Sequence, residues 1–134
     1  MRTITIDIQT NNLLLKDVGF DNCDPKTNGE YNILDKLICS SDFVLDVGAN
    51  CGEWSKRALD NGAHVIAFEP VPHEFDVLKK INNPNFKCHQ IALNDKDGVE
   101  TLYVCTKPLE KGMSSFYRSP EHWNKISVQT RSLD

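Results

Sequence analysis

Short stretches in which apolar and polar residues alternate open the chain. Thr3 to Ile8 places its isoleucines on one face, and Leu13 to Val18 repeats the alternation after an Asn11-Asn12 pair. Alternation with a period of two predicts β-strands, and paired asparagines favour a turn between them. A polar stretch follows, so residues 1–28 are expected to form an N-terminal β-hairpin and loop.

A helical repeat of apolar residues follows this loop. It falls between Gly29 and Cys39, on Ile33, Leu34, Leu37 and Ile38. Thr27 and Glu30 have the spacing of a capping box, in which the two side chains satisfy N–H groups at a helix start. The pattern predicts a helix from about Gly29 to Cys39 whose apolar face meets the core.

Strand and helix patterns alternate from residue 43 onward. Apolar runs predict strands over residues 43–47, 64–69 and 86–92. Helical stripes predict one helix over residues 53–60 and another from Pro72 to the residues before Pro84. Strands that alternate with helices predict an α/β fold with a parallel sheet.

Alternation with a period of two returns beyond Ala92. It predicts strands over residues 99–105 and 126–130, with a long loop over residues 107–120 between them. Residues 29–134 are therefore expected to form the second and larger unit of the chain.

Composition and charge fit an ordinary globular domain. Of the 134 residues, 40% are hydrophobic and 25% are charged, and the net charge is −4 without a basic block. A basic stripe is typical of nucleic-acid binders, so nucleic acid is not an expected partner. The first residues lack the apolar core of a signal peptide, and no apolar run is long enough to cross a membrane. A cytoplasmic location without a membrane partner is expected.

The five cysteines indicate free thiols. They are widely spaced, odd in number, and contain no pair with the close spacing of a zinc site. Neither a disulfide framework nor a metal site is expected.

The main candidate for chemistry is the segment from Asp46 to Gly52, which joins a predicted strand to a predicted helix. Gly48 permits a tight turn there, and Gly52 lets the helix begin close to the sheet. Free N–H groups at a helix start attract a negative ligand group such as a carboxylate. The segment therefore indicates a ligand loop.

Glu69 follows the next predicted strand and is directly before Pro70. In folds of this kind an acid at this position accepts hydrogen bonds from ribose hydroxyls. The two carboxylate oxygens suit a vicinal diol, since each can accept one hydroxyl proton. Glu69 could instead only cap the strand.

The loop favours S-adenosyl-L-methionine over NAD. Dinucleotide sites use G-x-G-x-x-G, whose middle glycine makes room for the pyrophosphate. Here Asn50 has a side chain at that place, and Asp46 puts a carboxylate where phosphates would lie. A ligand with an amino group and a sulfonium would be attracted by Asp46.

Several segments together resemble the FkbM-type methyltransferases. They are TNGEYNILDKL, VLDVGANCGEWS, VIAFEPVP, IALND from Ile91 to Asp95, GMSS from Gly112 to Ser115, and VQTRSLD. They occur in order between Gly19 and Asp134. The resemblance implies a Rossmann-like class I methyltransferase fold and methyl transfer to a hydroxyl, often of a sugar or small metabolite.

The resemblance also implies site residues. It places the methionine end of the cofactor against Asp46, Gly48, Ala49, Asn50 and Gly52. It places the ribose at Glu69 beside Pro70, and the adenine near Ala92. Ser114 and Ser115 lie in a loop that either closes over this site or is plain surface, whereas Trp54 is expected to pack.

The resemblance further implies that part of the catalytic machinery is missing. Asp134 falls just before the fourth strand of the family's sheet, from which substrate-facing groups largely come, so no catalytic base is assigned. The strand over residues 43–47 would then have an unpaired edge, which favours association with a second copy or a partner chain. The isolated chain is expected to be inactive.

Two other functions remain open on the sequence alone. The chain could be a non-catalytic module that binds S-adenosyl-L-methionine or a partner chain. A small NAD-linked oxidoreductase domain is the other alternative, although the missing middle glycine speaks against it.

Overall fold

Two four-stranded sheets organise the part of the chain that the structure describes. The computed structural model describes residues 3–5, 26, 29–105, 114–117 and 123–134. The first sheet is entirely parallel and has the order β1-β2-β3-β4. Its strands are β1 (Thr3–Thr5), β2 (Phe43–Val47), β3 (His64–Phe68) and β4 (Phe86–His89).

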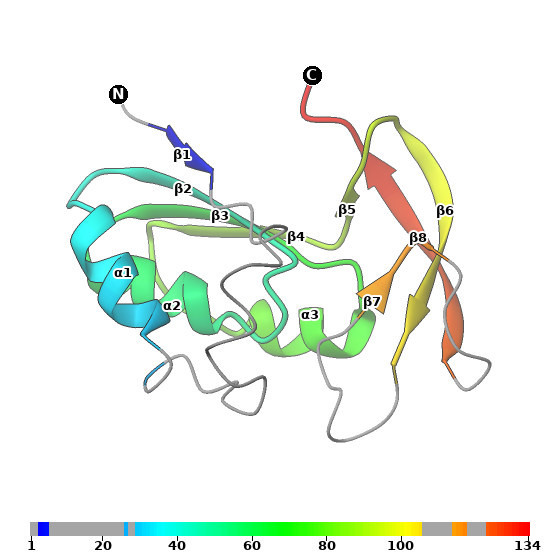
Figure 1. Ribbon diagram of the computed structural model, residues 1–134, viewed down its shortest axis with the longest axis horizontal. Helices are drawn as coiled ribbons and strands as arrows, with labels where there is room; N and C mark the ends of the chain where they lie inside the picture. Colours follow the sequence, from blue (N-terminus) through cyan, green and yellow to red (C-terminus); the bar gives the residue numbers. More distant parts are fainter. Residues whose placement is uncertain (1–2, 6–25, 27–28, 106–113, 118–122) are drawn as a thin grey trace.

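Three helices lie against one face of the first sheet (Figure 1). They are α1 (Glu30–Leu37), α2 (Glu53–Asp60) and α3 (Pro72–Leu78). The predicted α/β class with a parallel sheet is thus confirmed, and α2 has the predicted bounds. The helices cover a core in which Val44 and Val65 from the strands meet Leu34 and Leu78 from the helices.

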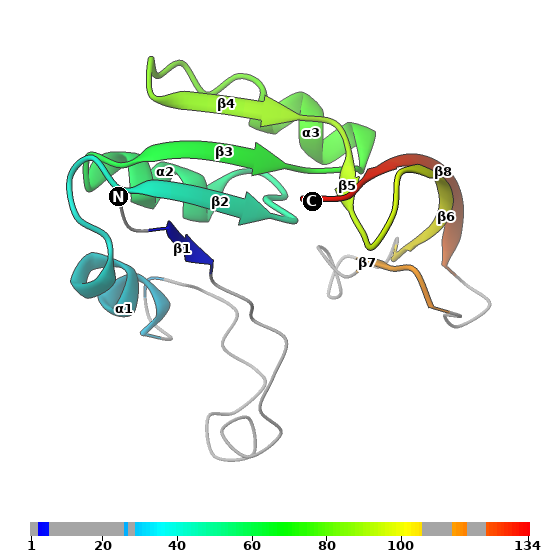
Figure 2. The ribbon, with the colours of Figure 1, turned by 90° about the horizontal axis from the view of Figure 1, so that it is seen from above.

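The second sheet is mostly antiparallel and lies beyond the carboxyl ends of β2, β3 and β4 (Figure 2). Its order is β5-β8-β6-β7, with β5 parallel to β8. The strands are β5 (Ala92–Leu93), β6 (Gly98–Val104), β7 (Ser114–Ser115) and β8 (Asn124–Arg131). A separate apolar cluster supports this sheet, formed by Val71, Ala92, Leu102 and Val128.

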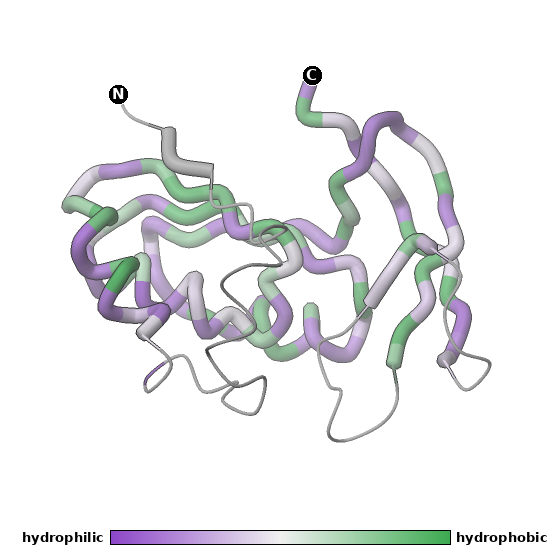
Figure 3. The backbone as a smooth tube through the Cα atoms, in the orientation of Figure 1, coloured by the Kyte–Doolittle hydropathy of each residue, from purple (hydrophilic) through white to green (hydrophobic). Residues whose placement is uncertain are grey.

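The predicted strand over residues 86–92 is wrong as a single element. The chain leaves the first sheet after His89 and joins the second sheet at Ala92, so the stretch contributes to both sheets. Hydropathy alone does not mark the change, because the residues on each side of it have strand character. Figure 3 shows the apolar segments along β2 and β3, which the sequence pattern did identify.

Helix α1 differs from its prediction at its start and on its apolar face. Its N-cap is Gly29, with φ at 94° and no side-chain cap hydrogen bond, whereas Thr27 of the predicted capping box lies outside the described residues. Leu34 and Ile38 are buried, whereas Ile33 is 59% and Leu37 is 43% exposed. Only half of the predicted apolar stripe meets the core.

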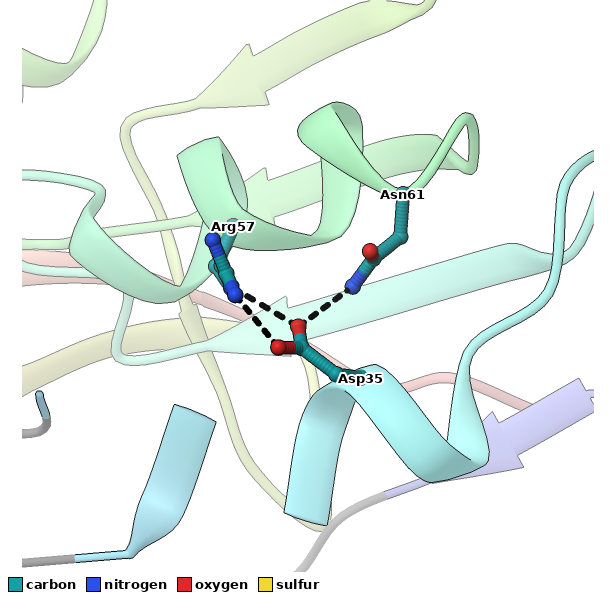
Figure 4. Close-up of polar contacts among 3 residues, drawn as sticks. All are labelled: Asp35, Arg57 and Asn61. Carbon is teal, nitrogen blue, oxygen red and sulfur yellow. Dashed lines mark hydrogen bonds and ion pairs between the residues drawn. The ribbon is translucent and has the colours of Figure 1, made fainter. Parts of the chain in front are cut away.

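Polar contacts join α1 to α2 at the surface (Figure 4). The Arg57 guanidinium donates to both carboxylate oxygens of Asp35, and the Asn61 amide donates to Asp35 Oδ1 at 3.0 Å. Arg57 also lies over the Tyr31 ring, 5.4 Å from its centroid. These exposed contacts fix the orientation of the two helices more than they add to stability.

The amino-terminal strand β1 is part of the first sheet. Thr3, Ile4 and Thr5 pair in parallel with Phe43, Val44 and Leu45 of β2. The predicted second strand of the hairpin, residues 13–18, lies outside the described residues. The edge of β2 that the sequence left open is therefore covered by β1 over these three positions.

Candidate functional site

The connection from β2 to α2 is a loop whose first N–H groups are tied to the neighbouring strand. Gly48 and Ala49 both donate to the Phe68 carbonyl, at 2.9 and 3.0 Å, and Gly52 donates to the Ala49 carbonyl at 2.8 Å. Since Phe68 is the last residue of β3, these bonds join the ends of two adjacent parallel strands.

The remaining two N–H groups of the loop also donate within the chain. The Asn50 N–H donates to Glu69 Oε2 at 2.8 Å, and the Cys51 N–H donates to Asn50 Oδ1 at 2.7 Å. All five N–H groups from residue 48 to residue 52 are thus engaged. These N–H groups are therefore occupied by partners within the chain.

Three residues of the loop have a left-handed backbone: Gly48 at φ 76°, Asn50 at φ 52° and Gly52 at φ 81°. Asparagine tolerates this conformation better than most residues. At Gly48 an added Cβ would meet nothing within 4 Å. The loop therefore leaves open space beside Gly48.

Glu69 connects the loop to the start of α3. Its Oε2 accepts the Asn50 N–H and its Oε1 accepts the Val71 N–H, both at 2.8 Å, and the residue is only 5% exposed. Burial raises the pKa of Glu69 above its ordinary value, the two backbone hydrogen bonds oppose the rise, and the charges of Glu74 and Asp46 add to it. The carboxylate thus holds the loop and retains one further lone pair on each oxygen.

Asp46 is directed to the first turn of α2. Its Oδ2 accepts the hydroxyl of Ser55 at 2.5 Å, and Ser55 is completely buried. Burial raises the pKa of Asp46 above its ordinary value, and the hydrogen bonds from Ser55 oppose that rise. Asp46 thereby fixes the position of α2 relative to β2.

A cavity of about 340 Å³ lies between the two sheets. The loops after β2 and β3 line one side, and residues of β5, β6 and β7 line the other. Two carboxylates, Glu69 and Glu74, are among the lining residues, together with the hydroxyls of Ser114, Ser115 and Tyr117. In the described part of the chain, no Lys, Arg or His lines this cavity.

The cavity brings together five of the eight residues predicted to bind a cofactor. These are Gly48, Asn50, Glu69, Pro70 and Ala92. The other three do not line it: Asp46 binds Ser55, Ala49 belongs to the core, and Gly52 faces α3. Ser114 and Ser115 also line it.

Sequence reasoning missed Glu74, Phe116 and Tyr117, which also line the cavity. Glu74 lies in the first turn of α3, where an acid is common for reasons of helix stability and gives no signal of a ligand. Its Oε2 is buried and has no hydrogen-bond partner among the described residues. Phe116 packs on the second apolar cluster, so only the fold places it beside the cavity.

Other residues considered from the sequence have ordinary structural roles. Trp54 packs against the first core cluster, and His89 stacks on Phe68 with ring centroids 5.6 Å apart. Among the described residues, Cys39, Cys51, Cys88 and Cys105 form no disulfide, whereas Cys23 lies outside the described residues. Burial raises the pKa of the Cys51 thiol, which disfavours the reactive thiolate.

The described residues show neither a metal cluster nor a membrane helix. Within them, no group of three or more His, Cys, Asp or Glu side chains is arranged to hold a metal ion. None of their helices combines the length and the apolar character that crossing a bilayer requires.

Comparison with known proteins identifies one family. The Methyltransferase FkbM domain matches residues 46–134, which include the loop after β2, Glu69 and the whole second sheet. No curated protein sequence and no solved structure matches the chain significantly.

Proposed function

Because the chain belongs to the Methyltransferase FkbM domain family, we propose that its cavity binds S-adenosyl-L-methionine as a methyl donor. We further propose a Rossmann-like class I fold and transfer of the methyl group to a hydroxyl of a sugar or small metabolite. In this proposal the cavity between the two sheets holds the donor.

The charge of the cavity is the observation that carries this proposal. Its described lining contains two carboxylates and no cationic side chain, and Asp46 is close enough to act on Glu69. S-adenosyl-L-methionine has a sulfonium and an ammonium group, which this environment attracts. The two negative charges of a dinucleotide pyrophosphate would be repelled.

The loop amides support the same choice of ligand. Pyrophosphate sites depend on free backbone N–H groups at the glycine-rich loop. Here all five N–H groups from residue 48 to residue 52 donate within the chain. We therefore assign both Gly48 and Asn50 to the methionine end of the ligand. Gly48 would leave space for it, and Asn50 would contact it through its side chain.

Glu69 is assigned to the ribose. Its two oxygens already accept one N–H each, so each can accept one hydroxyl through its other lone pair. Pro70 and Ala92 line the same cavity and are assigned to the ribose and adenine side. Asp46 is assigned an electrostatic and positioning role, because it binds Ser55 and does not line the cavity.

Methyl transfer from a sulfonium is an in-line displacement, in which the enzyme mainly positions the acceptor oxygen. A base that accepts the hydroxyl proton assists the reaction. We assign no base among the described residues. The same cavity would also serve a non-catalytic module that binds the donor, and a methyl-transfer assay with hydroxylated sugars separates the two functions.

Titration with S-adenosylhomocysteine and NADH tests the proposed ligand. We expect saturable binding of S-adenosylhomocysteine and none of NADH. Glu69→Ala should weaken the binding of S-adenosylhomocysteine by roughly tenfold or more, since hydrogen bonds to a charged group are lost. Glu100→Ala removes a carboxylate from β6 that does not line the cavity and serves as the control.

Two results would contradict the proposal. One is tighter binding of NADH than of S-adenosylhomocysteine. The other is unchanged binding by Glu69→Ala when circular dichroism shows that the variant is folded.

A further inference from the structure

The cavity between the two sheets has a buried interior and an exposed mouth. In its interior, Glu69 and Ala92 are each 5% exposed and Leu102 is 3% exposed. Two large side chains of the same lining face solvent instead, with Val47 51% and Tyr117 84% exposed. Val47 ends β2 and Tyr117 follows β7, so each sheet contributes one of them. These two residues form the mouth of the cavity.

The segment that carries Tyr117 is anchored to the second sheet. The Tyr117 N–H donates to Ser115 Oγ at 3.0 Å, and Ser115 pairs with Tyr103 of β6. Phe116, between them in the chain, packs on the second apolar cluster. A tyrosine side chain has an apolar body and a polar tip, so full exposure leaves apolar area in water that a ligand could cover. The fold thus presents this ring at the mouth of the cavity.

The methionine end assigned to the donor lies at the same mouth. Gly48 directly follows Val47 and is itself exposed, whereas Glu69, assigned to the ribose, is buried. The methyl group of S-adenosyl-L-methionine is on the sulfonium, which joins the methionine part to the ribose part. An acceptor that enters from solvent would therefore meet Val47 and Tyr117 on its way to the methyl group.

We propose that Tyr117 is a stacking platform for the acceptor, and that the acceptor is a neutral saccharide in its pyranose form. This inference rests on the proposed function and narrows its substrate class. A pyranose ring has a face of carbon-bound hydrogens and a rim of hydroxyls. The Tyr117 ring would cover that face, and the exposed hydroxyl of Ser114, which also lines the cavity, would serve the rim.

Saturation-transfer NMR on the chain with bound S-adenosylhomocysteine tests the platform. Methyl β-D-glucopyranoside is the probe, and sorbitol is the matched polyol that lacks a ring face. The glucoside should receive saturation mainly on the carbon-bound hydrogens of one ring face. Its affinity should exceed that of sorbitol roughly fivefold or more, because only the glucoside can stack on an aromatic ring.

Variants of Tyr117 separate stacking from other roles. Tyr117→Ala should weaken binding of the glucoside roughly fivefold or more and leave binding of sorbitol unchanged. Tyr117→Phe keeps the ring and should bind the glucoside like the unmodified chain. Tyr103→Ala removes a tyrosine ring from β6 that does not line the cavity, and serves as the control. All three variants should bind S-adenosylhomocysteine like the unmodified chain.

The outcomes distinguish this inference from the proposed function. If the unmodified chain does not bind S-adenosylhomocysteine, both are overturned. If it does, but the glucoside binds no better than sorbitol, only the platform is overturned. The platform is equally overturned if Tyr117→Ala binds the glucoside normally, if Tyr117→Phe loses it, or if Tyr103→Ala weakens it as much as Tyr117→Ala does.

Discussion

Asp46 and Ser55 meet at the start of α2, where a carboxylate is held in a buried position by one short hydrogen bond. Burial disfavours the charged form, so the pKa of Asp46 in the folded state lies above its ordinary value of 3.8. The folded chain therefore holds this proton more tightly than the unfolded chain. The stability that Asp46 contributes is fully present below pH 3.8 and is lost as the pH rises through the folded pKa.

Asp46→Asn should therefore gain stability relative to the unmodified chain as the pH rises. We expect the difference in the free energy of unfolding to grow above pH 3.8 and to level off above the folded pKa. Each unit of pKa shift corresponds to about 1.4 kcal/mol. Urea unfolding at several pH values measures this difference.

Asp76→Asn provides a control of opposite sign. The hydrogen bond from Lys79 lowers the pKa of Asp76 below 3.8, so its contribution is present above that pH and is lost as the pH falls. This variant should lose stability relative to the unmodified chain as the pH rises. A stability gain by Asp46→Asn that shrinks with rising pH would contradict the assigned shift.

At the scale of elements, Gly52 sets how closely α2 approaches α3. A Cβ at this position would lie 2.7 Å from the Cδ1 atoms of both Leu78 and Ile81, and φ is 81°. Steric overlap and backbone strain both act at this position. The glycine thus serves the packing of two helices rather than contact with a ligand.

Gly52→Ala should destabilise the fold by about 2–4 kcal/mol, the sum of overpacking and left-handed strain. Gly48→Ala introduces only the strain, because space beside it is open, and should cost about 1 kcal/mol. Gly98 lies outside the left-handed region and has its nearest contact at 3.7 Å, so Gly98→Ala should change stability little. Thermal unfolding of the three variants measures this order, and an equal effect of all three would refute it.

Elements with a strong local pattern could be predicted from the sequence. The apolar run over residues 43–47 and the helical stripe over residues 53–60 predicted the bounds of β2 and α2 to the residue. The switch between sheets after His89 could not be predicted, because it depends on which partner strand each segment meets. The exposure of Ile33 and Leu37 likewise depends on how little of α1 the sheet covers.

The candidate site could be predicted where function follows from local position. The loop after β2 and the acid after β3 lie at adjacent strand ends, so their proximity follows from a parallel sheet. Glu74, Phe116 and Tyr117 could not be predicted, since the second sheet brings the latter two to the cavity from distant positions in the chain. The charge of Asp46 is evident in the sequence and predicts a contact with the ligand. Its hydrogen bond with Ser55 depends on how α2 packs on β2 and could not be predicted.

At the scale of the whole molecule, the chain covers the edge that its sequence seemed to leave unpaired. Three residues of β1 pair with β2, although Asp46 and Val47 lie beyond that pairing. The face of the first sheet opposite the helices carries exposed apolar side chains. Phe43 is 37% exposed there and Val47 is 51% exposed. Association with a second copy or a partner chain over the sheet edge stays a prediction.

The two apolar clusters share no residue, and this separation determines which parts of the native chain can unfold locally. Residues of the three helices and the first sheet form one cluster, and Val71 with residues of the second sheet forms the other. Regions with separate cores can unfold partially and independently. In the free chain, amide hydrogens of β6 and β8 should therefore exchange with solvent through openings that leave β2 and β3 protected.

A ligand in the cavity touches both sheets and would join them into one cooperative unit. At a concentration about 100 times its dissociation constant, S-adenosylhomocysteine should slow exchange in β6 and β8 by about 100-fold. Native-state hydrogen exchange by mass spectrometry measures this, with NADH as the control. Slowing confined to the first sheet would show that the ligand does not bridge the two sheets, whereas slowing in both would make the bound cofactor a part of the folded core.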